Sequence, residues 1–471
     1  MSCQEPERVS YLVTHAHTRL FTLMVTLMLA AWTAASSAQN VSIAAGFKAG
    51  FTSSAVFLGG RNPLDVMREE LQGVQFVPDG LPAPVVDYEH QVVFVDYPGS
   101  AVPRMAVYRA GVGTTLTPPG WTLQDISKLP PVTIPMPTGD PVHLPWPDGD
   151  LIEAHAWPAV VDHARIQTVL DAAFTSGPHA HFKTIGVVVV YKNRLLAERY
   201  APGWGVHVPY RTWSTGKSIM SALIGILVRQ GRLKVDDRAP IAAWQGTDDP
   251  RNAITIRHLL HMSSGLNSGG TRTGMAYWGG INTAEAIVST SLQAKPGSRW
   301  EYANYDTLLL VLSMKEVLGG APEYWHFPYR ELLHKIGMRN TALELDPYGN
   351  FIMSSQNYST PRDLARFGLL YLHDGVWNGE RLLPEGWVDF TTQLAPADTQ
   401  QRYGAQFWLF GSDPRLPDDV FSTAGSRGQF ATICPSNDLV VVRMGLDPTG
   451  GRSWDQPGFV ADILAAIGET R

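Results

Sequence analysis

Apolar and polar positions after residue 158 follow two different periods, which predicts strands at both ends of this region and helices between them. Residues 164–177 carry apolar side chains at helical spacing, and 184–201 predict two strands that turn at Lys192-Asn193. Further strands are predicted at 404–410, 429–436 and 438–445, and helical segments at 253–265, 306–320 and 360–375. Parallel β-α-β alternation is missing. The pattern therefore predicts an α+β fold, with a sheet from 158–200 and 402–471 and a helical part at about 201–400.

The chain before residue 158 is predicted to contain two further parts. Residues 39–115 are typical of an accessory α/β segment, in which 62–72 predict a helix and the stretches 90–97 and 104–111 have the composition of strands. Prolines crowd residues 116–157, which predicts an extended connector and not a domain. We expect the accessory segment to pack against the sheet and to carry no catalytic group.

The first 38 residues are typical of a secretory signal. An apolar run at 20–33 follows a polar start, and small residues at Ser36 and Ala38 fit a cleavage site. The run is short and contains threonines, so an uncleaved anchor is the less favoured alternative. Cys3 would leave with the signal, and Cys434 alone cannot form an internal disulfide. We expect a secreted or periplasmic protein, cleaved near Ala38 and free of the membrane afterwards.

Charge and composition narrow the classes of partner. The net charge is -6 and no Lys/Arg-rich run is present, which argues against nucleic-acid binding and favours a small neutral substrate. His179 and His181 could suggest a metal pair, but no matching acidic or histidine cluster follows them. We therefore expect no metal and no cofactor, and the oligomeric state stays open.

The stretch Ser214-Thr215-Gly216-Lys217-Ser218 has two chemical interpretations. A phosphate-binding loop needs a glycine where Arg211 stands, which argues against that interpretation. If a helix begins at about Ser214, residues three apart share a face, so Ser214 and Lys217 become neighbours. The helix N-terminus would favour an oxyanion and burial would lower the lysine pKa, as an activated serine requires. The tetrapeptide alone favours a plainer interpretation, a helix-capping serine followed by a solvated lysine.

Longer stretches favour the catalytic interpretation. Residues 212–244, 254–266 and 295–312 closely resemble the serine β-lactamase and penicillin-binding-protein superfamily, in its class C-like branch of esterases, D-aminopeptidases and 6-aminohexanoate-dimer hydrolases. Residues 359–388 are most similar to the 6-aminohexanoate-dimer-hydrolase type. The similarity runs in order from about 160 to 465. It implies the β-lactamase/D,D-peptidase-like fold, a central antiparallel sheet flanked by helices with a helical insertion.

The resemblance implies a role for each matching residue. Ser214 would be the acylated nucleophile and Lys217 its basic partner. Tyr302-Ala303-Asn304 matches the family's Tyr-x-Asn element. Tyr302 would share proton transfer and could be held partly as phenolate by nearby amines. Asn304 would orient Lys217 or the substrate amide.

The third family element falls on Thr423-Ala424-Gly425, with Ser426 directly after it. On a strand beside the nucleophile, the Ser426 N–H could join the Ser214 N–H in an oxyanion hole. The family usually has Lys or His where Thr423 stands, and Thr423 cannot supply a cation. Arg427 could substitute, but its direction cannot be read from the sequence. This departure puts action on β-lactams in doubt and favours esters or amides without that carboxylate.

Two weaker signals complete the set. Ser426 also matches the nucleophile position of the A-x-S-x-G elbow of α/β-hydrolases. That elbow needs a helix directly after it, but residues 429–436 are predicted to form a strand. Tyr277, in the glycine-rich stretch 267–280, either lines the substrate mouth as an aromatic wall or belongs to a plain surface loop.

The sequence thus predicts a secreted serine hydrolase that forms an acyl-enzyme on an ester or amide. A β-lactamase or D-alanyl-D-alanine carboxypeptidase, and a non-catalytic binding protein of the same fold, stay as alternatives.

Overall fold

A six-stranded antiparallel sheet is assembled from both ends of the region after residue 158. Its strand order is β12-β13-β14-β15-β5-β6. The strands are β5 (Thr184–Tyr191), β6 (Arg194–Tyr200), β12 (Trp408–Leu409), β13 (Phe421–Gly425), β14 (Gln429–Cys434) and β15 (Leu439–Gly445). Lys192 and Asn193 both have positive φ, as a tight hairpin turn requires. The predicted α+β class is confirmed, although only two residues of the predicted strand 404–410 pair as β12.

The computed structural model describes residues 39–74, 77–78, 80–154, 156–175, 182–246, 248–269, 271–449 and 453–469. The predicted signal at 1–38 and the pair His179 and His181 lie outside the described residues.

Helices cover both faces of the sheet, because its central strands are apolar on both sides. On β15, Leu439 and Val441 belong to one buried cluster and Val440 and Val442 to another. Helices α3 (His163–Thr175) and α12 (Gln456–Ala466) pack in the first cluster, and α10 (Pro361–Leu372) lies in the second. This arrangement explains the unbroken run of valines in β5, which alternation alone would not predict.

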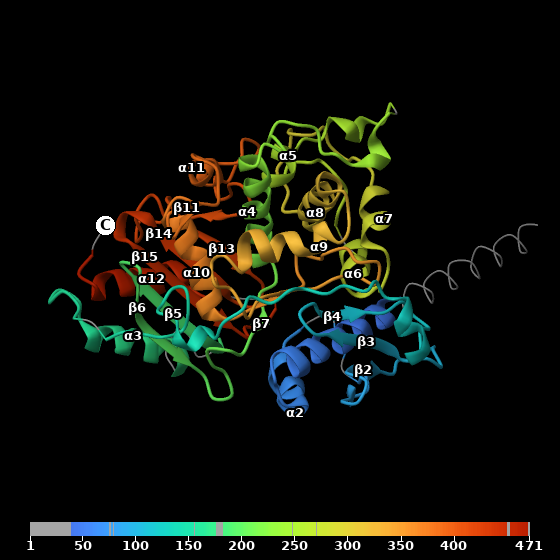
Figure 1. The fold of residues 1–471 in the computed structure, drawn as a ribbon, viewed down its shortest axis with the longest axis horizontal. Helices are drawn as coiled ribbons and strands as arrows, with labels where there is room; N and C mark the ends of the chain where they lie inside the picture. Colours follow the sequence, from blue (N-terminus) through green and yellow to red (C-terminus); the bar gives the residue numbers. More distant parts are fainter. Residues whose placement is uncertain are drawn as a thin grey trace, which may run out of the picture.

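The helical part lies between β6 and β12 in the sequence (Figure 1). Its central helix α4 (Thr215–Arg229) is buried all round from Thr215 to Leu227. Around it lie α5 (Ile256–Leu260), α6 (Thr271–Trp278), α7 (Thr283–Val288), α8 (Asn304–Leu318), α9 (Glu323–Pro328) and α11 (Trp387–Thr392), with the short strands β7 (Tyr210–Arg211), β8 (Ala342–Leu343), β9 (Asn357–Ser359), β10 (Val376–Trp377) and β11 (Glu380–Arg381). A helix with no exposed face can only be the core of this part, and it carries Lys217 into that core.

The accessory segment contains a long helix that the sequence did not predict. It spans Gln39–Leu58 and precedes α2 (Pro63–Asp65), a π-helical turn at Val66–Glu70 and a four-stranded sheet of β1 (Val85–Asp87), β2 (Val92–Val95), β3 (Arg104–Arg109) and β4 (Gly113–Leu116). The helix expected at 62–72 and the strands expected at 90–97 and 104–111 are present, but the helix at 39–58 was missed, because glycines lower the helix propensity of that stretch. Tertiary packing overrides that propensity: a side chain at Gly46 would collide with the backbone carbonyl of Trp278.

The Gln39–Leu58 helix is long and apolar enough to cross a membrane by length and composition alone, yet 67% of its most apolar window is buried inside the protein. Such burial is typical of a core helix. The helix packs on β3 and β4 and against Trp278 of α6. The accessory helix therefore contacts the helical part as well as strands of its own segment.

Hydrogen bonds to a buried carboxylate join the accessory segment to the rest of the chain. Glu344 lies 3.4 Å from Arg211, and both side chains are fully buried. The Ser54 hydroxyl donates to Glu344 at 2.5 Å and the Thr114 N–H at 3.0 Å. Burial raises the pKa of Glu344 to about 7, and Arg211 and these hydrogen bonds oppose that rise. The accessory segment thus supplies two of the donors that satisfy a carboxylate of the helical part.

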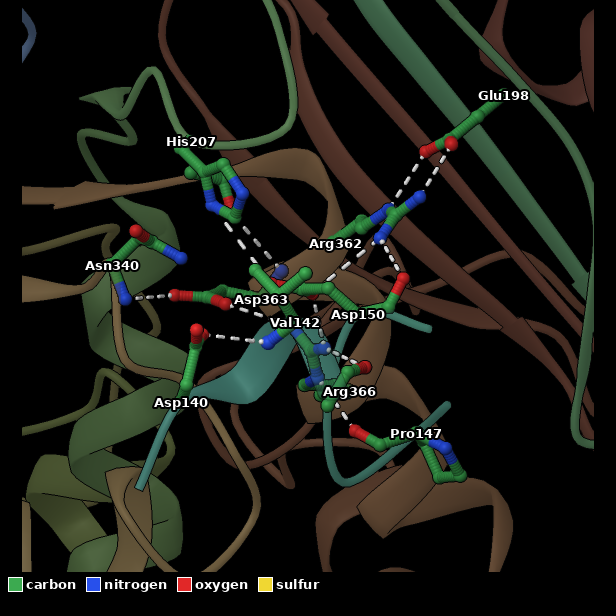
Figure 2. A network of polar contacts seen from close by, with 12 residues as sticks. Asp140, Val142, Pro147, Asp150, Glu198, His207, Asn340, Arg362, Asp363 and Arg366 are labelled. Atoms are coloured by element: carbon green, nitrogen blue, oxygen red, sulfur yellow. Dashed lines mark hydrogen bonds and ion pairs between the residues drawn. The ribbon is translucent and has the colours of Figure 1, made fainter. Parts of the chain in front are cut away.

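A second polar network holds the proline-rich stretch against the sheet region. This stretch has little regular structure beyond 3-10 turns at Leu123–Lys128 and Pro141–His143. Figure 2 shows Asp150 between two arginines of α10, at 2.8 Å from Arg366 and 3.4 Å from Arg362. Arg362 also pairs with Glu198 of β6 at 2.5 Å.

We expect Asp150→Ala to lower the free energy of unfolding by about 3 kcal/mol, because it leaves two buried guanidinium groups short of a partner. Urea denaturation of the purified variant measures this loss. Asp140→Ala is the control: Asp140 is exposed, caps the turn at Pro141–His143 and lies 3.9 Å from the exposed His143, so about 1 kcal/mol or less is expected. Equal effects of the two substitutions would contradict a structural role for the buried network.

Candidate active site

Ser214 lies at the start of α4, directly after a residue in a sparsely populated conformation. Trp213 has φ +52°, in the left-handed region that a bulky residue rarely adopts. Asn357 holds the chain there: its backbone carbonyl accepts from Thr212 N–H at 2.8 Å, and its side chain donates to the Trp213 carbonyl at 3.0 Å. Backbone strain held in place by hydrogen bonds is a common feature of functional sites.

The Ser214 side chain makes no capping hydrogen bond, so the interpretation of Ser214 as a simple helix cap is wrong. Its Oγ instead lies 3.0 Å from Lys217 Nζ. The alternative of a solvated lysine is wrong as well, because Lys217 is only 1% exposed.

Lys217 has three polar partners and no carboxylate among its hydrogen-bond partners in the described chain. Besides Ser214 Oγ, its Nζ lies 2.7 Å from Asn304 Oδ1 and 2.9 Å from the Ser354 carbonyl. Burial lowers the pKa of Lys217 to about 7. A large part of the Lys217 population is therefore neutral near pH 7.

The arrangement fixes the direction of the lone pair on neutral Lys217. The Asn304 Oδ1 and Ser354 carbonyl oxygens can only accept, so they take the two N–H groups. The remaining tetrahedral direction faces Ser214 Oγ. The serine hydroxyl can then donate its proton to the amine, which is the step that activates a nucleophile.

Gly216 explains how the Ser354 carbonyl reaches the lysine. A side chain at this position of α4 would collide with Asn357 Oδ1 and the Met353 carbonyl. The absence of a side chain lets the segment 353–357 lie against the first turn of α4. The S-x-G-K spacing is thus a packing requirement as well as a chemical one.

Tyr302 lies beside this pair and faces it with its ring. Lys217 Nζ lies over the ring face, 4.9 Å from the ring centroid. Burial raises the pKa of Tyr302 to about 12, and the Ser214 hydroxyl opposes the rise only in part. The expected phenolate is therefore disfavoured, because the neighbouring amine is itself largely neutral. Tyr302 is a phenol near neutral pH, able to donate a proton and not to accept one.

A cavity of about 660 Å³ opens over Ser214. Its lining residues come from six separate parts of the chain: Asn40, Ile43, Trp213, Ser214, Thr273, Gly274, Tyr277, Trp278, Tyr302, Asn304, Ser354, Ser355 and Ser426. Tyr277 lies on this wall and not on a plain surface loop, and its hydroxyl is 2.6 Å from Ser354 Oγ. Within the described lining no side chain is acidic or basic.

The third family element contributes to this site less than expected. Thr423 is fully buried in β13, its Oγ1 accepts from Ala431 N–H at 3.2 Å, and it does not line the cavity. Gly425 acts through packing, because a side chain there would collide with the Thr212 carbonyl. Ser426, in the turn after β13, does reach the cavity.

Arg427 does not replace the missing cation. Its guanidinium donates to the backbone carbonyls of Glu70, Gln72, Leu446 and Asp447, away from the cavity. It anchors the accessory segment instead.

The two other sequence interpretations have no structural support. The residues before Ser214 form the short strand β7, whereas a phosphate-binding loop would wrap around its ligand at this point. The turn at Ser426 leads into strand β14, where an A-x-S-x-G elbow needs a helix.

Sequence reasoning missed Ser354, Asn357, Asn40 and Ile43. Ser354 and Asn357 lie in irregular chain and a three-residue strand about 140 positions after Ser214, and act largely through backbone groups or buried amides. Asn40 and Ile43 lie in the helix that was not predicted. No periodicity marks any of the four as part of a site.

Comparison with known proteins agrees with this geometry. The model of the β-lactamase family matches residues 170–453, which is more than half of the chain. The chain belongs to the β-lactamase family. It is a serine hydrolase of that family, and the resemblance seen in its motifs is confirmed.

Individual relatives of this β-lactamase-family chain are distant. It is 23% identical over 321 residues to the 6-aminohexanoate-dimer hydrolase of Paenarthrobacter ureafaciens, covering 60% of this chain and 79% of that one. A family VIII carboxylesterase structure is 15% identical with a TM-score of 0.53, covering 68% of this chain and 100% of that one. An octameric penicillin-binding protein homologue from Pyrococcus abyssi is 16% identical with a TM-score of 0.51, covering 65% and 77%. The two structures support the fold.

We expect Lys217 to titrate near pH 7, far below an ordinary lysine, because burial disfavours its charged form. NMR of protein labelled at lysine side chains measures this, and Lys217→Arg assigns the signal. Asn304→Asp should raise the Lys217 pKa by about one to three units, since it places a carboxylate beside the amine. A Lys217 signal near pH 10 in the wild type would contradict the proposed activation of Ser214.

Proposed function

We propose that this protein cleaves an ester or amide bond through an acyl-enzyme on Ser214. The observation that carries the proposal is the placement of Lys217, whose lone pair two carbonyl oxygens direct to Ser214 Oγ. The relative named 6-aminohexanoate-dimer hydrolase and the neighbour named carboxylesterase act, by their names, on these two bond types.

In the first step Ser214 Oγ attacks the substrate carbonyl while its proton passes to Lys217 Nζ. The N–H groups of Ser214 and Ser426 stabilise the resulting oxyanion, and neither donates a hydrogen bond to another residue in the part of the chain that the structure describes. Ser426 lines the same cavity as Ser214, which supports this pairing.

In the second step the tetrahedral intermediate collapses and the bond to the alcohol or amine breaks. Tyr302, a phenol near neutral pH, protonates the leaving group and recovers its proton from Lys217. Water then attacks the acyl-enzyme and gives its proton to Lys217. Ser214 regains a proton as the acid is released, so the enzyme returns to its starting state.

An uncharged cavity favours this function over the hydrolysis of β-lactams. Thr423 is buried away from the cavity and Arg427 points away from it. A β-lactam carboxylate would meet no cation among the described lining residues. Esters and amides without a carboxylate close to the reacting bond fit better.

We expect Ser214→Ala to lower hydrolysis of p-nitrophenyl acetate by at least about 10³-fold, because the residual catalysis would come from the oxyanion hole alone. A fluorophosphonate probe should label Ser214 of the wild type, as located by peptide mass spectrometry. Ser221→Ala is the matched control, a buried serine two turns further along α4 and outside the cavity lining.

Unchanged hydrolysis in Ser214→Ala would disprove the mechanism. Absence of both labelling and hydrolysis in the wild type would favour a non-catalytic binding protein. A stable penicilloyl adduct on Ser214 would favour the β-lactamase or carboxypeptidase alternative.

We also propose that the protein is secreted or periplasmic and is cleaved after Ala38. The apolar run at 20–33, followed by small residues at Ser36 and Ala38, supports this proposal. We expect N-terminal sequencing of protein exported by a bacterial host to read Gln39-Asn40-Val41. Full-length protein retained in the membrane fraction would favour an uncleaved anchor.

A further inference from the structure

Part of the cavity wall comes from outside the family region. Asn40 and Ile43 line the cavity with Ser214, yet they precede the matched residues 170–453 by more than 120 positions. Asn40 is exposed, whereas Ile43 is only 9% exposed. The Gln39–Leu58 helix therefore adds an outer polar contact and a deeper apolar one.

Ile43 packs where α6 leaves space for it. A side chain on Gly274 of α6 would start 3.5 Å from Ile43 Cγ2, so this glycine and Ile43 lie against each other on the cavity wall. With Trp213, Tyr277 and Trp278 this wall is mostly apolar. A cavity of this size and composition suits an apolar chain.

A second layer of the same helix supports the aromatic part of the wall. Phe47 lies between the two tryptophans that line the cavity, with ring centroids 4.9 Å from Trp278 and 6.3 Å from Trp213. The guanidinium of Arg211 lies 4.5 Å from the Trp278 ring and 5.3 Å from the Trp213 ring. The helix thus holds a fixed position relative to Ser214, which the Ser54–Glu344 hydrogen bond reinforces.

We propose that the Gln39–Leu58 helix is the specificity element of this site, with Ile43 contacting the apolar acyl chain of an uncharged ester and Asn40 at the outer end of that chain. This inference rests on the proposed acyl-enzyme chemistry. A charged acyl group would lose its hydration against this wall without gaining an ion pair, so the site selects neutral acyl chains.

The test compares p-nitrophenyl acetate with p-nitrophenyl octanoate, which share a leaving group and differ only in the acyl chain. We expect Ile43→Ala to lower the octanoate-to-acetate ratio of kcat/KM about tenfold, mainly through KM, because the contact is made only by the long chain. Val41→Ala, on the same helix but outside the cavity lining, should leave the ratio within about twofold. An unchanged ratio in Ile43→Ala would overturn the proposal.

A second variant does not depend on a core substitution. Asn40→Lys places an ammonium on an exposed position of the lining, where it can pair with a carboxylate on the acyl chain. It should raise kcat/KM for p-nitrophenyl hemisuccinate relative to p-nitrophenyl butyrate about tenfold. Gln39→Lys, exposed but outside the lining, is its control. Equal changes in the two variants would overturn the placement of the acyl chain at Asn40.

The outcomes separate this inference from the proposed function. If the wild type hydrolyses none of the esters and resists the fluorophosphonate probe, the acyl-enzyme chemistry itself fails. If all variants hydrolyse acetate with unaltered ratios, the chemistry stands and the helix is not the specificity element.

Discussion

The burial of one lysine without an opposite charge is the constraint on which the site depends. A charged ammonium in such a place is costly, so the amine gives up its proton near neutral pH and becomes a base. Two carbonyl oxygens then decide where its lone pair points. Each needs its own structural support: Asn304 begins α8, and Ser354 approaches only because residue 216 has no side chain.

The same constraint explains the character of the surrounding residues. A carboxylate beside Lys217 would stabilise its charged form and remove the base, so a neutral amide and a backbone carbonyl serve as partners. Tyr302 presents a ring face to the amine and keeps its own proton. An uncharged environment therefore extends from the lysine to the cavity above it. It keeps the amine neutral, so that it can act as a base, and it favours uncharged substrates.

Local patterns predicted what local geometry determines. The shared face of Ser214 and Lys217 follows from helical spacing, and the hairpin at Lys192-Asn193 from residues that accept positive φ. Ordered motifs predicted the fold and the family.

Patterns could not predict what long-range contacts determine. Arg427 follows a strand as expected, but its direction is set by carbonyls of the accessory segment about 355 residues earlier. Gly46 lowers the helix propensity of 39–58, and the structure needs a glycine there because a side chain would collide with the Trp278 carbonyl. The phenolate expected at Tyr302 depended on a charged neighbour, and only the burial of Lys217 shows that this neighbour is largely neutral.

The contact between Ser54 and Glu344 spans 290 residues. The serine–lysine pair, by contrast, lies within one turn of α4. The wall that Asn40 and Ile43 add to the cavity is held through the distant contact, and the base beside the nucleophile is held through the local one. Reactivity and substrate discrimination therefore depend on contacts of very different range in the sequence.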